Sequence, residues 1–70
     1  MTGTDIKNYR KRRGVTLAEG GSELHISAQA VAKAEAKPEI TQGDYLRYTA
    51  AIETAQVVTI QKRESAGGAG

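Results

Sequence analysis

The sequence contains no cysteine and a single histidine among its 70 residues. The absence of cysteine excludes disulfide bonds and thiolate metal sites, and one histidine is too few for a structural zinc site. No apolar run approaches the ~18 residues that a membrane span requires, and the N-terminus lacks the apolar region of a signal peptide. We therefore expect one small domain in a reducing cytoplasm, with no metal, no cofactor and no membrane partner.

The chain also lacks the features of a catalytic site. It has no cysteine nucleophile, no glycine-rich phosphate loop and no pair of carboxylates with an evident pocket. A chain of this length has little volume for an enclosed substrate site and no room for a separate effector domain. We expect neither enzymatic activity nor a small-molecule effector.

The net charge is only +2, but the basic residues are unevenly distributed. Half of the ten lysines and arginines lie within seven consecutive positions: Lys7, Arg10, Lys11, Arg12 and Arg13. A cluster of this kind is either a solvated face or a surface that binds a polyanion. The neighbouring sequence has to decide between the two.

Residues 15–36 have the pattern of two short helices joined by a tight turn. Thr16, followed three residues later by Glu19, has the spacing of a capping box and predicts a helix over residues 17–24. Ser27 is a second N-cap candidate, and the alanine-rich segment after it favours a helix. The few residues between these helices leave room only for a sharp turn. The sequence therefore predicts a helix-turn-helix unit.

Three residues of this unit are unusual in such a position. Gly20 and Gly21 lie inside the first helix and together cost ~2 kcal/mol of helix propensity relative to alanine. Two explanations remain open: another backbone passes close by, or the helix is poorly formed. His25 occupies the turn, where we expect a residue with positive φ rather than a catalytic or metal-binding group.

A further helix is predicted on each side of this unit. The first is expected to begin at Thr4, which serves as its N-cap, and to end at Gly14. The last is expected to begin after Thr41 and to continue to about Thr54. Its inward side chains are expected to be Leu46, Ala50 and Ile52.

Residues 56–62, QVVTIQK, change the pattern, because β-branched side chains favour a strand over a helix. A lone strand in a helical domain leaves its backbone donors and acceptors unpaired. The same strand of a second copy can satisfy them across a two-fold axis. The residues expected to form this dimer contact are Val57, Val58, Thr59 and Ile60. The alternative is a helix that continues for a few residues before the tail.

Residues 4–54 resemble the phage Cro and repressor family of helix-turn-helix (XRE-like) proteins. The resemblance rests on the segments IKNYRKRRG, Val15-Thr16, Leu24-His25-Ile26-Ser27, Val31, Ala34-Glu35 and YLRYTAAI. The chain departs from the family at Gly20 and Gly21, where leucine and alanine are usual, and at His25, where glycine is usual. The resemblance implies a mainly α fold of four to five helices, to which the C-terminal strand would add a dimer contact.

On this basis the chain divides into four segments. They are a flexible N-terminus (1–3), a helix-turn-helix DNA-binding domain (4–54), a dimerisation strand (55–63) and a disordered tail (64–70).

The resemblance also implies which side chains meet DNA. The helix after Ser27 would lie in the major groove and read base edges through Ser27, Ala28, Gln29, Ala32 and Lys33. Phosphates would be bound by Lys11, Arg12, Arg13, Thr16 and Lys37. Arg10 and Glu35 match an arginine and a glutamate that commonly pair in the family, so we expect a partly buried ion pair here. The alternative is that this alanine-rich helix presents only a solvated face.

We therefore expect a sequence-specific regulator of transcription that binds double-stranded DNA. By the resemblance it is a cytoplasmic, nucleoid-associated repressor of phage, plasmid or mobile-element type, acting as a homodimer on a pseudo-palindromic operator. The alternative is a protein-interaction module, or an antitoxin-like protein, that binds a partner through the C-terminal strand.

Overall fold

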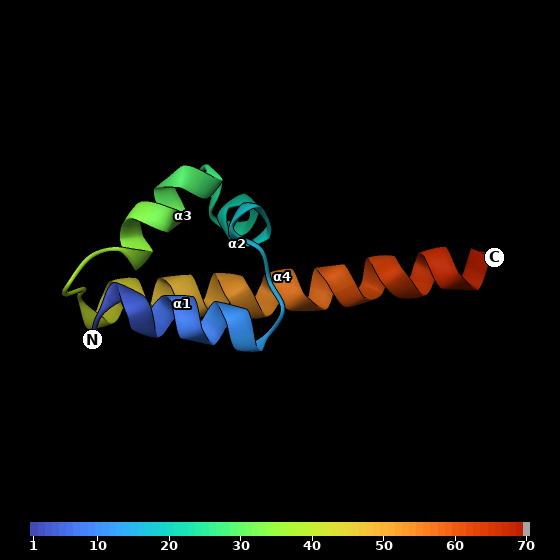
Figure 1. Ribbon diagram of the computed structural model, residues 1–70. Helices are drawn as coiled ribbons and strands as arrows, with labels where there is room; N and C mark the ends of the chain where they lie inside the picture. The colour runs from blue at the N-terminus through green and yellow to red at the C-terminus, as the bar shows by residue number, and fades with distance from the viewer. Residues whose placement is uncertain (70) are drawn as a thin grey trace.

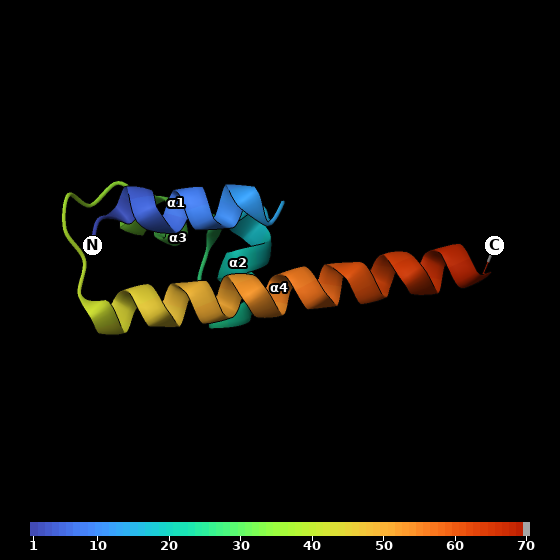
Figure 2. The ribbon, with the colours of Figure 1, turned by 90° about the horizontal axis from the view of Figure 1, so that it is seen from below.

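The computed structural model describes the backbone of residues 1–69 and the side chains of residues 1–62. This part of the chain forms four helices: α1 (Gly3–Arg12), α2 (Leu17–Leu24), α3 (Ala28–Glu35) and α4 (Gln42–Ala69). In Figures 1 and 2, α1 and α4 run side by side in the same direction, and α2 and α3 lie together on one side of them. The C-terminal half of α4 extends beyond the other helices as a single rod (Figure 1). The expected mainly helical fold is confirmed.

The hydrophobic core lies between α1, α3 and α4. Ile6, Val31 and Ile52, one from each of these helices, are the largest fully buried side chains. Tyr48 and Ala55 extend the same cluster along α4. Burial of a large aliphatic side chain stabilises a fold by roughly 1.5–3 kcal/mol, so these three residues fix how the helices pack.

The predicted N-caps of α2 and α3 are confirmed. The Thr16 hydroxyl accepts a hydrogen bond from the Glu19 N–H (3.1 Å), and the Glu19 carboxylate accepts one from the Thr16 N–H (2.8 Å). The Ser27 hydroxyl accepts a hydrogen bond from the Ala30 N–H at 3.1 Å. Each cap satisfies backbone donors that have no partner within the helix, and so fixes where the helix begins.

The predicted start of α1 was wrong by two residues. The N-cap is Thr2, not Thr4, because Thr2 and Asp5 form a reciprocal capping box. Residues 1–3, expected to be flexible, make two backbone hydrogen bonds to the segment after α3: the Gly3 N–H donates to the Lys37 carbonyl (2.9 Å), and the Ile40 N–H donates to the Met1 carbonyl (2.9 Å). A Cβ at Gly3 would lie 2.3 Å from a carbonyl oxygen of α3, so this contact requires glycine.

The predicted strand at residues 56–62 is helical, and residues 1–69 contain no strand. A helix satisfies its backbone donors and acceptors within one chain, whereas a lone strand would leave them unpaired. The helix propensity lost at each β-branched residue is less than ~0.7 kcal/mol, which is smaller than the cost of leaving backbone groups unpaired. The tail expected to be disordered, 64–70, falls on residues whose side chains lie outside the description. Within it, α4 continues to Ala69, and Gly70 is not described.

The inward face of α4 also differs from the prediction. Ile52 is buried as expected, but Leu46 is 57% exposed and Ala50 is exposed. The residues that share the inward face with Ile52 are Tyr48 and Ala55, four positions before it and three after it. Because neighbours on one helix face are three or four residues apart, Leu46 and Ala50 necessarily point elsewhere.

Candidate nucleic-acid interface

The turn between α2 and α3 brings two backbones into close contact. A Cβ at Gly21 would lie 2.7 Å from the Ile26 carbonyl oxygen, a distance that side chains do not adopt. Gly20 is not crowded in this way, because an added Cβ there would lie 3.9 Å from Ile52 and 4.0 Å from Val15. Close packing therefore explains Gly21, whereas Gly20 occupies a position that has room for a side chain.

His25 ends α2 in the left-handed conformation, with φ 58° and ψ 38°. Its N–H donates to the Ser22 carbonyl, and the next N–H, of Ile26, donates to the Gly21 carbonyl. These bonds satisfy the last carbonyls of α2 and turn the chain towards α3. The expectation of a turn residue with positive φ is confirmed.

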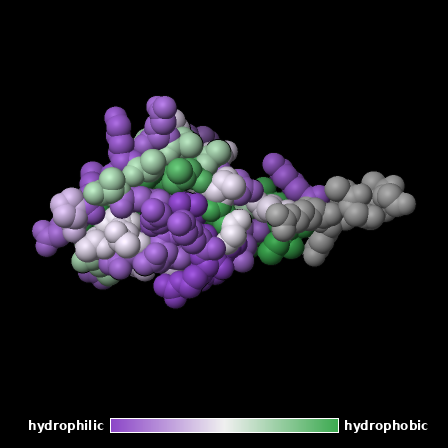
Figure 3. Space-filling model, viewed as in Figure 1, coloured by the Kyte–Doolittle hydropathy of each residue, from purple (hydrophilic) through white to green (hydrophobic). Residues whose placement is uncertain are grey.

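The outer face of α3 brings together the five residues predicted to read bases. Ser27, Gln29, Ala32 and Lys33 are exposed and Ala28 is half-buried, whereas Val31, Ala34 and Glu35 are buried on the opposite side. Gln29 and Lys33 are four residues apart, so their side chains lie on the same face one turn from each other. Figure 3 shows hydrophilic side chains projecting from this edge of the molecule.

Behind α3, Arg10 of α1 and Glu35 form the predicted ion pair. Arg10 Nε donates to Glu35 Oε2 (2.7 Å), and Arg10 Nη2 donates to Glu35 Oε1 (3.1 Å). The third guanidinium donor, Nη1, reaches the Val15 carbonyl at 3.0 Å. The two side chains are only 11% and 6% exposed, so the pair is not available to DNA. It joins the end of α3 to α1 and to the loop before α2.

Of the five residues predicted to bind phosphates, the cations Lys11, Arg12 and Lys37 are exposed. Thr16 is also exposed, and its hydroxyl oxygen caps α2. These residues lie at the ends of helices: Lys11 and Arg12 in the last turn of α1, and Lys37 just after α3. Each remains accessible to a polyanion.

Arg13, the remaining predicted phosphate contact, is instead used within the protein. Its guanidinium lies over the Tyr9 ring, 4.2 Å from the centroid, and donates from Nη1 to Gln56 Oε1 at 3.3 Å. Its Nη2 lies 3.8 Å from Glu53 Oε1. Arg13 therefore joins α1 to α4, while its side chain stays 36% exposed.

Tyr9 belongs to the same α1–α4 contact, because its hydroxyl donates a hydrogen bond to Glu53. Desolvation raises the pKa of the Tyr9 hydroxyl above its ordinary value, and the bond to Glu53 raises it further. The positive charge of Arg13 acts in the opposite direction. The shift favours the protonated hydroxyl, which is the form that donates to Glu53.

Lys7 is a cation near α3 that the sequence reasoning did not assign to DNA. It lines a hollow of about 210 Å³ between α1 and α3, together with Ala32 and Ala36. Lys7 is exposed and lies across this hollow from Ala32 of α3. The sequence could have indicated this position for Lys7, because Lys7 and Lys11 are four residues apart in α1 and so share a face.

The four residues predicted to dimerise do not share one edge. Val57 and Ile60 are 53% and 46% exposed, whereas Val58 and Thr59 are half-buried towards α2. The Thr59 hydroxyl donates to Glu19 Oε2 at 2.8 Å. In Figure 3, hydrophobic atoms appear beside α4 where it leaves the body.

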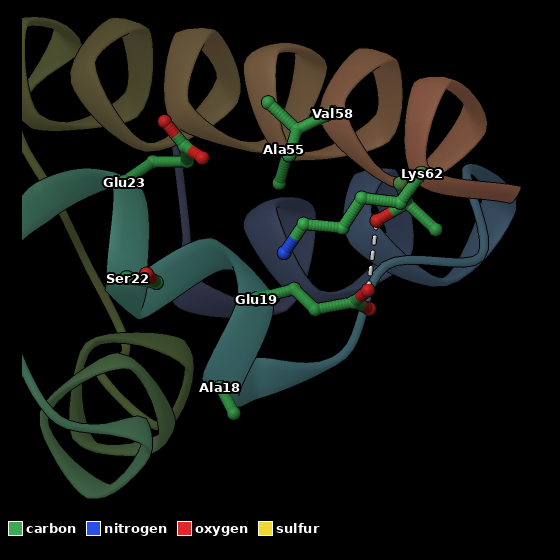
Figure 4. Close-up of a pocket in the computed structure, with 8 residues that line it drawn as sticks. Ala18, Glu19, Ser22, Glu23, Ala55, Val58 and Lys62 are labelled. Atoms are coloured by element: carbon green, nitrogen blue, oxygen red, sulfur yellow. Dashed lines mark hydrogen bonds between the residues drawn. The ribbon is translucent and has the colours of Figure 1, made fainter. Parts of the chain in front are cut away.

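A hollow of about 330 Å³ lies between α2 and the outer half of α4. Ala18, Ala55 and Val58 contribute apolar surface, Glu23 also lines the hollow, and the Lys62 side chain extends from α4 across it (Figure 4). Within the described residues, no group of three or more metal-binding side chains is arranged to hold a metal ion. The same part of the chain contains no helix that combines the length and apolar character needed to cross a membrane.

Comparisons of the chain with models of protein families, with curated proteins and with solved structures gave no match.

Proposed function

We propose that this protein is a sequence-specific regulator of transcription that binds double-stranded DNA through α3. The observation that carries the proposal is the arrangement of α3 itself. Ser27 caps its exposed end, Gln29 and Lys33 project from its outer face, and the buried pair behind it fixes its orientation. A helix presented in this way can enter the major groove with its first residues against base edges.

The chemistry of the outer face supports base reading. The Gln29 amide can pair with adenine through two hydrogen bonds, and the Lys33 ammonium can donate to O6 and N7 of guanine. The methyl groups of Ala28 and Ala32 can contact thymine. With two long polar side chains per copy, further specificity has to come from DNA shape and from a second half-site.

Affinity would come from the exposed cations around α3. Lys7 on one side and Lys37 on the other can neutralise phosphates that flank the groove, and Lys11 and Arg12 extend this basic surface. Phosphate contacts position a protein on the duplex without reading sequence.

By the resemblance, two copies act on a pseudo-palindromic operator with half-sites ~34 Å apart, and the protein represses by blocking polymerase. The same resemblance supports a phage, plasmid or mobile-element origin and a nucleoid location.

A protein-interaction module is the second candidate, favoured by the exposed apolar residues of α4. The strand that would have joined a partner's sheet is not present in residues 1–69. Salt separates the two candidates. Binding of a DNA reader to random duplex falls steeply between low and physiological salt, and an interaction module gives a flat response.

Selection of bound duplexes from a random library tests the proposal. We expect a motif that is lost when Gln29→Ala and Lys33→Ala are combined. The matched control combines Gln42→Ala and Lys62→Ala, which remove the same groups from exposed positions of α4 and should leave the motif intact. A motif that survives the α3 changes would overturn the assignment of α3 as the reading helix.

A further inference from the structure

The carboxylate of Glu19 accepts a hydrogen bond at each of its two oxygens. Oε1 accepts from the Thr16 N–H at 2.8 Å, which is one half of the capping box that begins α2. Oε2 accepts from the Thr59 hydroxyl of α4 at 2.8 Å, the bond drawn as a dashed line in Figure 4. One carboxylate therefore caps α2 and joins it to a residue 40 positions away in the sequence.

Thr59 lies between two hollows of the structure. One, of about 330 Å³, is shared with α2, and the other, of about 300 Å³, is shared with Arg13, Gly14 and Val15 at the end of α1. A side chain is held by packing only where neighbouring atoms are in contact with it. On these two sides packing contributes little, so the hydrogen bond to Glu19 is the directional link between this turn of α4 and α2.

The chemistry of this link suits it to hold a side chain in place. A hydroxyl that donates to a carboxylate forms a charge-assisted hydrogen bond, which is roughly twice as strong as a neutral one. Glu19 and Thr59 are both half-buried, so water competes for the carboxylate less than on an open surface. A glutamate side chain has several rotatable bonds, and ordering them costs free energy. The Thr59 hydroxyl favours the orientation that the Thr16 N–H requires.

We infer that Thr59 is a positioning residue that acts through Glu19. It holds the carboxylate in the capping box and so orders the first turn of α2. Thr16 is exposed at this end of the helix and is one of the residues predicted to contact phosphate. Because phosphate contacts fix how a protein sits on the duplex, order at Thr16 strengthens DNA binding. This consequence rests on the proposed function.

Exchange of the Thr16 amide hydrogen, followed by NMR without DNA, tests the positioning role. Thr59→Val removes the hydroxyl but keeps a β-branched side chain, and exchange at Thr16 should become roughly threefold to tenfold faster. Thr59→Ser keeps the donor and should match the wild type. The matched control is Thr54→Val, which removes an exposed hydroxyl of α4 that donates to the Ala50 carbonyl, and should leave the Thr16 rate unchanged.

The amide hydrogens of α1 serve as the internal reference. A general loss of stability would speed exchange throughout the chain, whereas the loss of one link to the cap should act on the first turn of α2. Equal Thr16 rates in Thr59→Val and Thr54→Val, or an increase shared by α1, would overturn the inference.

A double-mutant cycle tests the consequence for DNA. Fluorescence anisotropy with a duplex of the selected motif should show roughly threefold to tenfold weaker binding for Thr59→Val. The base preference should not change, because Gln29 and Lys33 are intact. Glu19→Ala should also weaken binding. Adding Thr59→Val to it should cause no further loss, because the hydroxyl then has no carboxylate to hold.

The outcomes of the cycle separate the inference from the proposed function. Additive losses would show that Thr59 does not act through Glu19 and would overturn the inference. Faster exchange at Thr16 with unchanged DNA affinity would overturn the link between the cap and DNA binding. A wild-type chain that binds no duplex would overturn the proposed function, whereas faster Thr16 exchange in Thr59→Val would still establish the positioning role.

Discussion

Arg10 and Glu35 form a bidentate ion pair between the first helix and the end of the third, with bonds of 2.7 and 3.1 Å. Because both side chains are almost fully buried, each charge depends on the other for solvation. The pair therefore sets the angle of α3, the helix on which the proposed function rests.

Glu35→Ala should be largely unfolded. Removing one partner of a buried pair costs about 3–5 kcal/mol, which is as much as a domain of this size usually has. The double variant Arg10→Met with Glu35→Leu replaces the pair by apolar side chains of similar volume and should recover much of the stability. Urea denaturation followed by circular dichroism measures both. Equal losses in the single and double variants would show that the stranded charge is not the cause.

The two glycines of α2 should respond in opposite directions to alanine. Gly20→Ala should stabilise the protein by about 0.5–1 kcal/mol, because alanine favours the helix and the new methyl meets Ile52 and Val15 at ordinary distances. Gly21→Ala gains the same propensity but forces the methyl against the Ile26 carbonyl oxygen at 2.7 Å. It should therefore destabilise by about 1–3 kcal/mol. The difference between the two midpoints in urea isolates the close approach, and equal midpoints would disprove it.

The caps of α2 and α3 were predictable because they depend on residues within one turn. Thr16 with Glu19, and Ser27 before an alanine-rich segment, act locally and needed no knowledge of the rest of the fold. The start of α1 was missed for a local reason as well. Thr2 and Asp5 form the same capping box, but with aspartate in place of the usual glutamate. Thr4 was a competing N-cap candidate close by.

The errors at the C-terminal end have a different origin. Whether Val57–Ile60 form a strand or a helix depends on the helix already built from Gln42 to Ala55, which carries the segment forward. The role of Arg13 likewise depends on Tyr9 and Glu53, and Glu53 is forty residues away in the sequence. Neither relationship appears in a local pattern. The ion pair of Arg10 was foreseen only because a family resemblance supplied the distant partner.

His25→Gly should stabilise the protein by about 0.5–1 kcal/mol. The residue is held at φ 58°, where a side chain costs energy that glycine does not, although the greater freedom of glycine in the unfolded chain offsets part of the gain. Gly14, at φ 67°, provides the reverse test, since nothing lies within 4 Å of an added Cβ. Gly14→Ala should lose about 1 kcal/mol through conformation alone. Thermal or urea midpoints that move in the same direction for both variants would contradict this account.

The basic residues of α1 should separate into two groups when DNA binding is measured against salt. Lys11→Ala and Arg12→Ala should each lower the slope of log affinity against log salt by about 0.9, since each side chain is exposed and free to meet a phosphate. Arg13→Ala should leave the slope unchanged and instead lower the urea midpoint, because this guanidinium is held over Tyr9 and beside Gln56. Fluorescence anisotropy over a salt series gives the slopes. A full change of slope for Arg13→Ala would mean that this side chain leaves α4 on binding and would return it to the interface. Unchanged slopes for Lys11→Ala and Arg12→Ala would instead remove the end of α1 from the DNA surface and leave Lys7 and Lys37 as its cations.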